Sequence, residues 1–152
     1  MDLDLIRLEK KIKINGMCSK YSANLTKEET EWVLSGNLDF LLSKKNPLLQ
    51  EFYSKLRGEL LAPRTVVRYD REAFLFPAGN VRITIDRNLH GDLHPHTFLE
   101  TKPPALPMLD GFPILEIKYD QFLPEIVRMA VQVPNRKTEA LSKYALCRQK
   151  IE

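Results

Sequence analysis

The sequence lacks long apolar runs. A membrane-spanning helix needs about 18 consecutive apolar residues or more, and no stretch of the chain reaches that length. The N-terminal segment MDLDLIRLEKK has acidic residues before its first basic one and no apolar core of the kind found in signal peptides. We therefore expect no membrane span and no secretion signal in this chain.

The sequence also has few cysteines and a small net charge. Cys18 and Cys147 match no C-x-x-C spacing, so the simplest interpretation is two reduced thiols in a cytoplasmic domain, with a disulfide as the alternative. Lys and Arg number 23 against 20 Asp and Glu, and a net charge of +3 is too small to indicate a nucleic-acid partner. The 152 residues, 43% of them hydrophobic, predict one globular domain spanning 1–152.

Charged and apolar residues alternate in three segments. Residues 6–14, IRLEKKIKI, would as a β-strand place four charged side chains on one face: Arg7, Glu9, Lys11 and Lys13. The same alternation occurs in VRITID at 81–86 and in LEIKYD at 115–120. A solvated sheet face with cross-strand ion pairs would explain one such strand. Three favour a barrel whose charged interior holds a polyanion, with cations on its phosphate oxygens and a carboxylate on a divalent metal.

Turn and capping patterns follow the first of these strands. Asn15-Gly16 is typical of a tight hairpin turn, which would lead into a second strand at 17–25. Thr26 and Glu29 form a capping-box pattern for a helix that Gly36 would end. The first part of the chain is therefore expected to be a hairpin followed by helical structure.

The rest of the chain is expected to be helical over 37–61, with Pro47 in the first turn of a helix, and then rich in β-structure. Strands are expected at 65–69, 73–76, 81–86 and 114–119. The segment 87–111 contains four prolines and is expected to be a loop with one short strand near 97–100. Later helical segments are expected at 123–133 and at the start of 139–148.

Five segments occur in an order found in a known family: 8–26 (LEKKIKINGMCSKYSANLT), 66–74 (VVRYDREAF), 81–86 (VRITID), 114–120 (ILEIKYD) and 139–147 (EALSKYALC). Over nearly its whole length the sequence thereby resembles the VTC domain, the polyphosphate polymerase domain of the triphosphate tunnel metalloenzyme superfamily. The resemblance implies an α+β fold, in which an antiparallel β-tunnel has an ionic interior and helices packed outside.

The resemblance also implies an activity. VTC domains transfer the γ-phosphoryl group of ATP to a growing chain of inorganic polyphosphate and use Mn2+ or Mg2+. Such a reaction needs charge neutralisation, metal placement and in-line alignment more than covalent chemistry from the protein. Three alternatives stay open: a module that binds polyphosphate or triphosphate without turnover, a triphosphate hydrolase, and an inactive truncated relic.

The resemblance assigns roles to particular residues. Basic side chains in catalytic contact with phosphate would be Lys11, Lys13, Arg71, Arg82 and Lys143. Further substrate contacts would come from Arg68, Lys118 and Ser142. The carboxylates expected to bind the metal are Glu116 and Glu9. An ion pair with a neighbouring charged residue is the alternative for six of them: Glu9, Lys11, Lys13, Arg71, Arg82 and Glu116.

The first strands of the family's domain have no counterpart in this sequence. VTC domains begin with a strand of the type R-H-E-x-K-Y and a basic strand of the type K-I-R-x-R, and neither precedes 6–14 in this sequence. We therefore expect an incomplete tunnel that lacks part of one wall. Its unpaired strand edges would need a second chain or a different closure.

Overall fold

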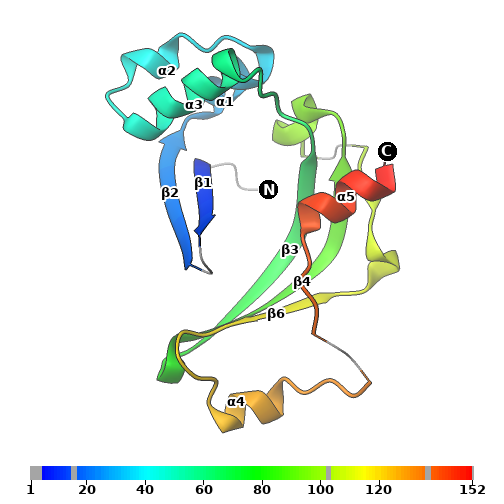
Figure 1. The fold of residues 1–152 in the computed structure, drawn as a ribbon. Helices are drawn as coiled ribbons and strands as arrows, with labels where there is room; N and C mark the ends of the chain where they lie inside the picture. The colour runs from blue at the N-terminus through cyan, green and yellow to red at the C-terminus, as the bar shows by residue number, and fades with distance from the viewer. Residues whose placement is uncertain (1–4, 15–16, 102–103, 136–137, 152) are drawn as a thin grey trace. The chain divides into compact units, whose positions relative to one another are not determined.

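The structure is a computed structural model that describes residues 5–14, 17–101, 104–135 and 138–151. Within these ranges helices are combined with antiparallel strands, which confirms the predicted α+β class (Figure 1). None of the helices in the described ranges has the length and apolar character needed to cross a membrane.

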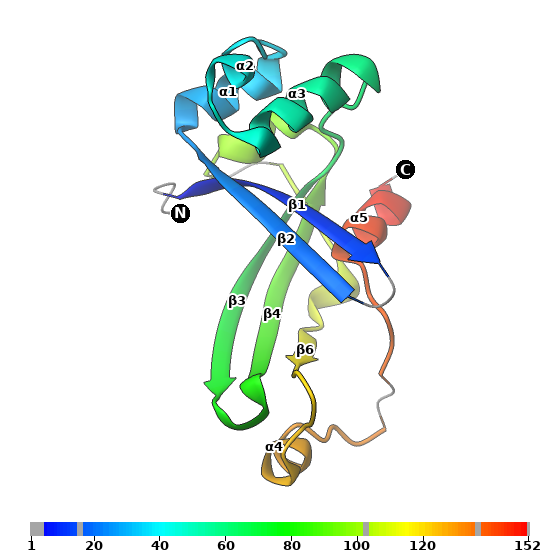
Figure 2. The same cartoon turned by 60° about the vertical axis from the view of Figure 1, so that its left-hand side comes forward.

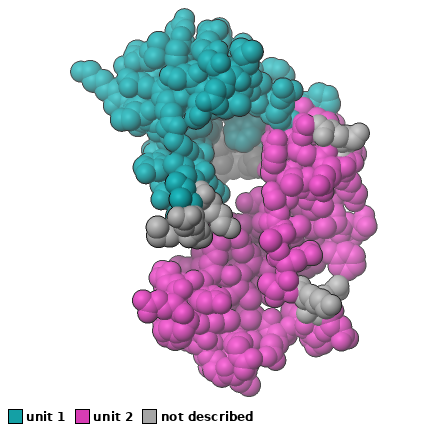
Figure 3. Space-filling view, in the orientation of Figure 1, with its two compact units in different colours: residues 1–64, 94–103 teal, residues 65–93, 104–152 magenta. Residues whose placement is uncertain are grey.

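The chain divides into two compact units, residues 1–64 with 94–103 and residues 65–93 with 104–152 (Figure 3). The first unit contains a two-stranded sheet and the second a four-stranded one. Among the described strands no pairing closes either sheet into a barrel, in agreement with the expected incomplete tunnel.

A hairpin opens the first unit. Strand β1 (Ile6–Ile14) pairs antiparallel with β2 (Met17–Leu25) along its whole length, from Ile6 opposite Leu25 to Ile14 opposite Met17. Both strands have the bounds predicted from the sequence. The predicted turn at Asn15-Gly16 lies outside the described residues.

Helix α1 (Lys27–Ser35) begins and ends as its sequence predicts. The Thr26 hydroxyl oxygen accepts from the Glu29 N–H at 3.1 Å, and the Glu29 carboxylate accepts from the Thr26 N–H at 3.0 Å. These reciprocal bonds satisfy two amides that the first helical turn would otherwise leave unpaired. Gly36, with a φ of 84°, ends the helix in the left-handed conformation that glycine adopts without strain.

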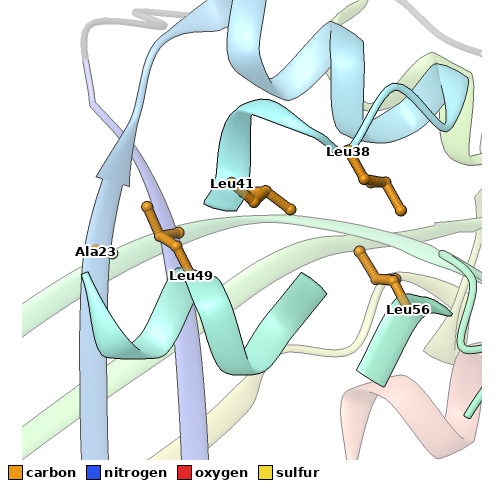
Figure 4. Close-up of a cluster of buried hydrophobic side chains, with 5 residues drawn as sticks. All are labelled: Ala23, Leu38, Leu41, Leu49 and Leu56. Carbon is orange, nitrogen blue, oxygen red and sulfur yellow. The ribbon is translucent and has the colours of Figure 1, made fainter. Parts of the chain in front are cut away.

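Two more helices complete the core of the first unit. These are α2 (Phe40–Ser43) and α3 (Pro47–Gly58), and Pro47 stands in the first turn of α3 as predicted. The core consists of Ala23 from β2 with Leu38, Leu41, Leu49 and Leu56 (Figure 4). The leucines recur at helical spacing, which places them on the helix faces that meet in this core.

The second unit is built around one long hairpin. Strands β3 (Val66–Phe76) and β4 (Val81–Asp92) run side by side (Figure 2). The other edge of β4 pairs with β5 (Leu106–Pro107) and with β6 (Ile114–Lys118), so β4 lies at the centre of the sheet.

Three strand predictions for residues 65–100 are wrong, and the last of them falls in the first unit. The strands expected at 65–69 and 73–76 are one strand, β3, because a register shift between Arg68 and Asp70 lets the pairing continue through the polar residues between them. Strand β4 runs on into the expected loop as far as Asp92, since Val66 to Arg68 supply pairing partners there. The strand expected near 97–100 is instead the 3-10 helix η2 (Pro95–Leu99), whose first residue is a proline.

The turn between β3 and β4 makes a close backbone contact. The segment 77–80 contains the 3-10 turn η1 (Ala78–Asn80), in which Gly79 has a φ of 75°. The Asp120 N–H donates to the Gly79 carbonyl oxygen at 3.2 Å, and a Cβ added to Gly79 would lie 2.5 Å from the Phe122 carbonyl oxygen. Glycine is therefore required here for both its φ and its small size.

Two helices follow β6. The helix expected at 123–133 is shorter, α4 (Glu125–Ala130), and it begins directly after Pro124. The closing helix is α5 (Lys143–Ile151), so the prediction that 139–148 begins as helix is wrong. Ser142 sets this start, because its hydroxyl oxygen accepts from the Ala145 N–H at 3.2 Å.

Helix α5 packs on the sheet of its own unit (Figure 1). Cys147, which is fully buried, forms a core with Leu89 of β4 and Met108, and Leu146 packs beside them. Burial raises the pKa of the Cys147 thiol. Both cysteines are free, and Cys18 is exposed.

Candidate functional site

One face of the four-stranded sheet is ionic. Residues directly opposite each other in an antiparallel pair project from the same face. The register sets Arg71 against Asp86, Thr84 against Glu116 and Arg82 against Lys118. We call these side chains, together with Lys143, the ionic face: Arg71, Arg82, Thr84, Asp86, Glu116, Lys118 and Lys143.

Asp86 is the centre of this face. Its side chain has 0% exposure, and its carboxylate accepts from Arg71 at two points, Nε to Oδ1 at 2.6 Å and Nη2 to Oδ2 at 2.7 Å. Lys143 Nζ lies 2.8 Å from the same Oδ2. The hydrogen bond from Arg71, with Lys143 adding to it, holds the pKa of Asp86 below its usual range, and Asp86 in turn raises the pKa of Arg71. One buried carboxylate thus joins β3, β4 and α5.

Tyr69 supports both cations. Arg71 Cζ lies 5.0 Å and Lys143 Nζ 5.3 Å from the centroid of its ring. These distances are within the range of cation–π attraction. The ring and the Asp86 carboxylate therefore restrain the same two side chains.

Glu116 is the more accessible carboxylate of the ionic face. Its side chain has 36% exposure, with Oε1 3.2 Å from Lys118 Nζ and Oε2 3.8 Å from Arg71 Nη2. The Thr84 hydroxyl donates to Oε2 over a long 3.5 Å. The ion pair considered as an alternative role for Glu116 is therefore present, but it is open to water and its contacts are weaker than those of Asp86.

Arg82 and Lys118 bring two positive charges to directly opposite positions. Both residues are exposed, and Arg82 has no ion pair within the described part of the chain. Like charges at opposed positions of a sheet repel each other. An anion bound between them would remove that repulsion.

The hairpin of the first unit has a second ionic face. The register sets Glu9 against Ser22 and Lys11 against Lys20, and Lys13 occupies the position opposite Cys18. Lys20 Nζ lies 2.5 Å from Glu9, and this hydrogen bond lowers the pKa of Glu9. Lys11 forms no ion pair with the described residues, although it contributes to the field around Glu9.

The predicted residues are therefore distributed over both units. Contacts in the second unit connect Arg71, Glu116, Lys118 and Lys143, and Arg82 joins them through its register with Lys118. Arg68 lies in β3 opposite His90, beyond the register shift, and Ser142 caps α5. The remaining predicted residues, Glu9, Lys11 and Lys13, lie in β1 of the first unit.

Sequence reasoning assigned no role to Asp86 or Lys20. The alternation in 81–86 put Asp86 on a charged face, but its role depends on Arg71 being directly opposite. Counting outward from the turn at 77–80 would have paired the two residues. The same counting from Asn15-Gly16 would have set Lys20 against Lys11.

A metal ion would find one suitable carboxylate on the ionic face of the second unit. No group of three or more His, Cys, Asp or Glu side chains gathers among the described residues. Mg2+ and similar hard ions are often held by one or two carboxylates together with phosphate oxygens of the substrate. Glu116 fits that arrangement, because its carboxylate is partly exposed, whereas Asp86 is buried between two cations.

The sequence model of the VTC domain matches residues 1–151. The chain belongs to the VTC domain family, which confirms the resemblance and supports a polyphosphate-related function at the level of the family. No curated protein and no solved structure matches the sequence.

Proposed function

We propose that the chain binds inorganic polyphosphate on its ionic face and, with Mn2+ or Mg2+, transfers the γ-phosphoryl group of ATP to the end of that chain. The observation that carries the proposal is the charge of the face. Four cations, Arg71, Arg82, Lys118 and Lys143, stand beside two carboxylates, Asp86 and Glu116. Such a surplus of positive charge is what a chain of phosphates needs for binding.

The two cations bound to Asp86 keep free donors for phosphate. Asp86 takes the Nε–H and one Nη2–H of Arg71, so both Nη1 hydrogens and the second Nη2 hydrogen are not used by it. Lys143 donates to Asp86 and retains further ammonium hydrogens. A planar guanidinium can bind two phosphate oxygens at once, so Arg71 is suited to clamp the substrate.

Glu116 is the proposed metal ligand of this face. A divalent ion bound there would neutralise phosphate charge in the transition state. For this, Lys118 has to exchange the Glu116 carboxylate for a phosphate oxygen, which costs little because their ion pair is exposed. Glu9, the second carboxylate that the resemblance implies, has to release Lys20 in the same way.

Phosphate contacts are also proposed for the hairpin face of the first unit and, separately, for two further residues of the second unit. We propose that Lys11 and Lys13 bind phosphate oxygens, and that Lys20 does so as well because it stands opposite Lys11. Arg68, in β3 opposite His90, and Ser142, at the start of α5, are proposed as further substrate contacts in the second unit.

A second candidate is a module that binds polyphosphate or triphosphate without turnover. The ion pairs of Glu116 with Lys118 and Arg71 favour it, because they compete with a metal for the carboxylate. A triphosphate hydrolase would use the same face and differ only in having water as the acceptor.

We also propose a cytoplasmic location for the chain and its pairing with a second chain. A cytoplasmic location is supported by two free cysteines and by the supply of ATP there. A second chain is proposed to pair with a strand edge, because β3 has a partner on only one side among the described strands.

The reaction is tested by incubating the full chain with ATP, Mn2+ and short polyphosphate, and measuring ADP release and chain length. The expected result is chain growth that Glu116→Gln abolishes and that Glu31→Gln, a change at an exposed glutamate of α1, leaves intact. Equal activity of both variants would contradict the assignment of Glu116. Binding without ADP would favour the second candidate, and ADP without chain growth would favour hydrolysis.

A further inference from the structure

Asp86 stands where three elements of the second unit meet. It lies in β4, its bidentate partner Arg71 lies in β3, and its second partner Lys143 is the first residue of α5. The carboxylate is inaccessible to solvent, while Lys143 has 19% side-chain exposure and Arg71 has 30%. Asp86 is therefore out of reach of a ligand that could still contact both of its partners.

The carboxylate also holds together two cations that would otherwise repel each other. Arg71 and Lys143 both bond to Asp86, and both lie over the ring of Tyr69. Without the negative charge, two partly exposed cations would lie close together over the same ring. Such groups move apart toward water when their partner is removed.

The ion pair of Lys143 fixes the start of α5. Ser142 caps this helix, and one turn further along Cys147 is buried against Leu89 and Met108. The helix is thus attached to the sheet at two points, one ionic and one apolar.

We propose that Asp86 is the positioning residue of the phosphate site: it aims Arg71 and Lys143 at the ligand and holds the N-terminal turn of α5 on the sheet. This inference rests on the proposed function, since the ligand is taken to be a phosphate chain. For the removal of Asp86 it predicts a change in anion affinity that is opposite in sign to the change expected from net charge alone. Removing a carboxylate from a cationic face should strengthen anion binding if only net charge mattered, whereas loss of a positioning residue weakens it.

The test compares Asp86→Asn with the wild-type chain in two measurements. Asparagine has nearly the size of aspartate, but its amide nitrogen cannot accept a hydrogen bond from either cation. Affinity is measured by titration with inorganic tripolyphosphate. Docking of α5 is measured as the rate at which a thiol reagent modifies Cys147, in a Cys18→Ser background that removes the exposed cysteine.

A matched variant controls for loss of stability. Val81 is buried in the same strand, with its side chain on the opposite face from Asp86, so Val81→Ala destabilises the sheet without touching the ionic face. Asp86→Asn is expected to weaken tripolyphosphate binding about tenfold or more and to speed modification of Cys147. Val81→Ala is expected to leave the affinity of the folded protein unchanged.

The outcomes separate this inference from the proposed function. Tighter or unchanged tripolyphosphate binding by Asp86→Asn would overturn the positioning role, as would an equal loss of affinity in Val81→Ala. If the wild-type chain itself does not bind tripolyphosphate, the proposed function fails. In that case faster modification of Cys147 in Asp86→Asn than in Val81→Ala would still support the docking role, and equal rates would overturn it.

Discussion

Arg71 and Asp86 are direct cross-strand partners whose side chains form a two-point ion pair, Nε to Oδ1 at 2.6 Å and Nη2 to Oδ2 at 2.7 Å. A buried pair of this kind loses much of its desolvation cost only when the remaining lone pairs are satisfied. Lys143 satisfies one of them, at 2.8 Å. Asp86 therefore holds the Arg71 and Lys143 side chains in defined positions before any ligand binds.

The first prediction concerns acid stability. The pKa of Asp86 is lowered in the folded chain, so its contribution to the free energy of unfolding is fully present above the unfolded pKa of about 3.9 and is lost as the pH falls through the lower folded value. Urea unfolding at neutral pH and at successively lower pH should show a steeper loss in the wild-type chain than in Asp86→Asn. Parallel losses in both proteins would contradict this assignment.

The second prediction concerns the turn at Gly79. Alanine there would require a strained positive φ and would bring its Cβ to 2.5 Å from the Phe122 carbonyl oxygen. Gly79→Ala should lower the free energy of unfolding by about 1–3 kcal/mol, measured by denaturant unfolding.

Gly58 offers the matched control for that change. It is the last residue of α3, and a Cβ added to it would meet no atom within 4 Å. Alanine has the higher helix propensity, by about 1 kcal/mol at most, so Gly58→Ala should be neutral or slightly stabilising. The account of the turn is wrong if the two variants lose stability equally.

The third prediction concerns the capping box of α1. Thr26→Ala removes the acceptor of the Glu29 N–H and should cost about 1 kcal/mol of unfolding free energy. Ser54 is the control, because its hydroxyl donates to the Gln50 carbonyl oxygen on an exposed part of α3 and caps no helix end. Ser54→Ala should change stability by less than about 0.5 kcal/mol; a loss as large as that of Thr26→Ala would refute the capping role.

These helix ends could be predicted from the sequence because caps are local. Thr26, Glu29 and Gly36 lie within one short segment, and their side chains and φ values decide the ends of α1 without help from the rest of the fold. The alternation of β1, β4 and β6 is local in the same sense, and it located the two ionic faces.

Features that depend on long-range pairing were not predicted. Strand β4 extends to Asp92 because Val66 to Arg68 pair with it. Strand β3 is continuous because of a register shift between Arg68 and Asp70, and no sequence pattern near Arg68 predicts that shift. The contacts of Asp86 join three elements that are distant in sequence. Arg71 lies 15 residues before Asp86, and Lys143 lies in the last helix. Sequence patterns located its face but not its contacts.

The fourth prediction concerns the opposed cations Arg82 and Lys118. Arg82→Ala removes a like-charge contact and breaks no ion pair within the described residues, so the free energy of unfolding should stay within about 0.5 kcal/mol of the wild-type value or rise. Thermal or urea unfolding measures this, with Arg64→Ala as the control at an exposed arginine outside both ionic faces. A clear loss of stability in Arg82→Ala alone would mean that Arg82 has a structural role.

Titration of the full chain with inorganic tripolyphosphate, compared between Arg82→Ala/Lys118→Ala and Arg64→Ala/Lys45→Ala, tests whether the ionic face is the phosphate site. Both double variants remove the same charge, but only the first removes it from that face. We expect the first to bind about tenfold or more weakly and the second to bind like the wild-type chain, with affinities that fall as salt is added. Equal affinities of the two double variants would contradict the account.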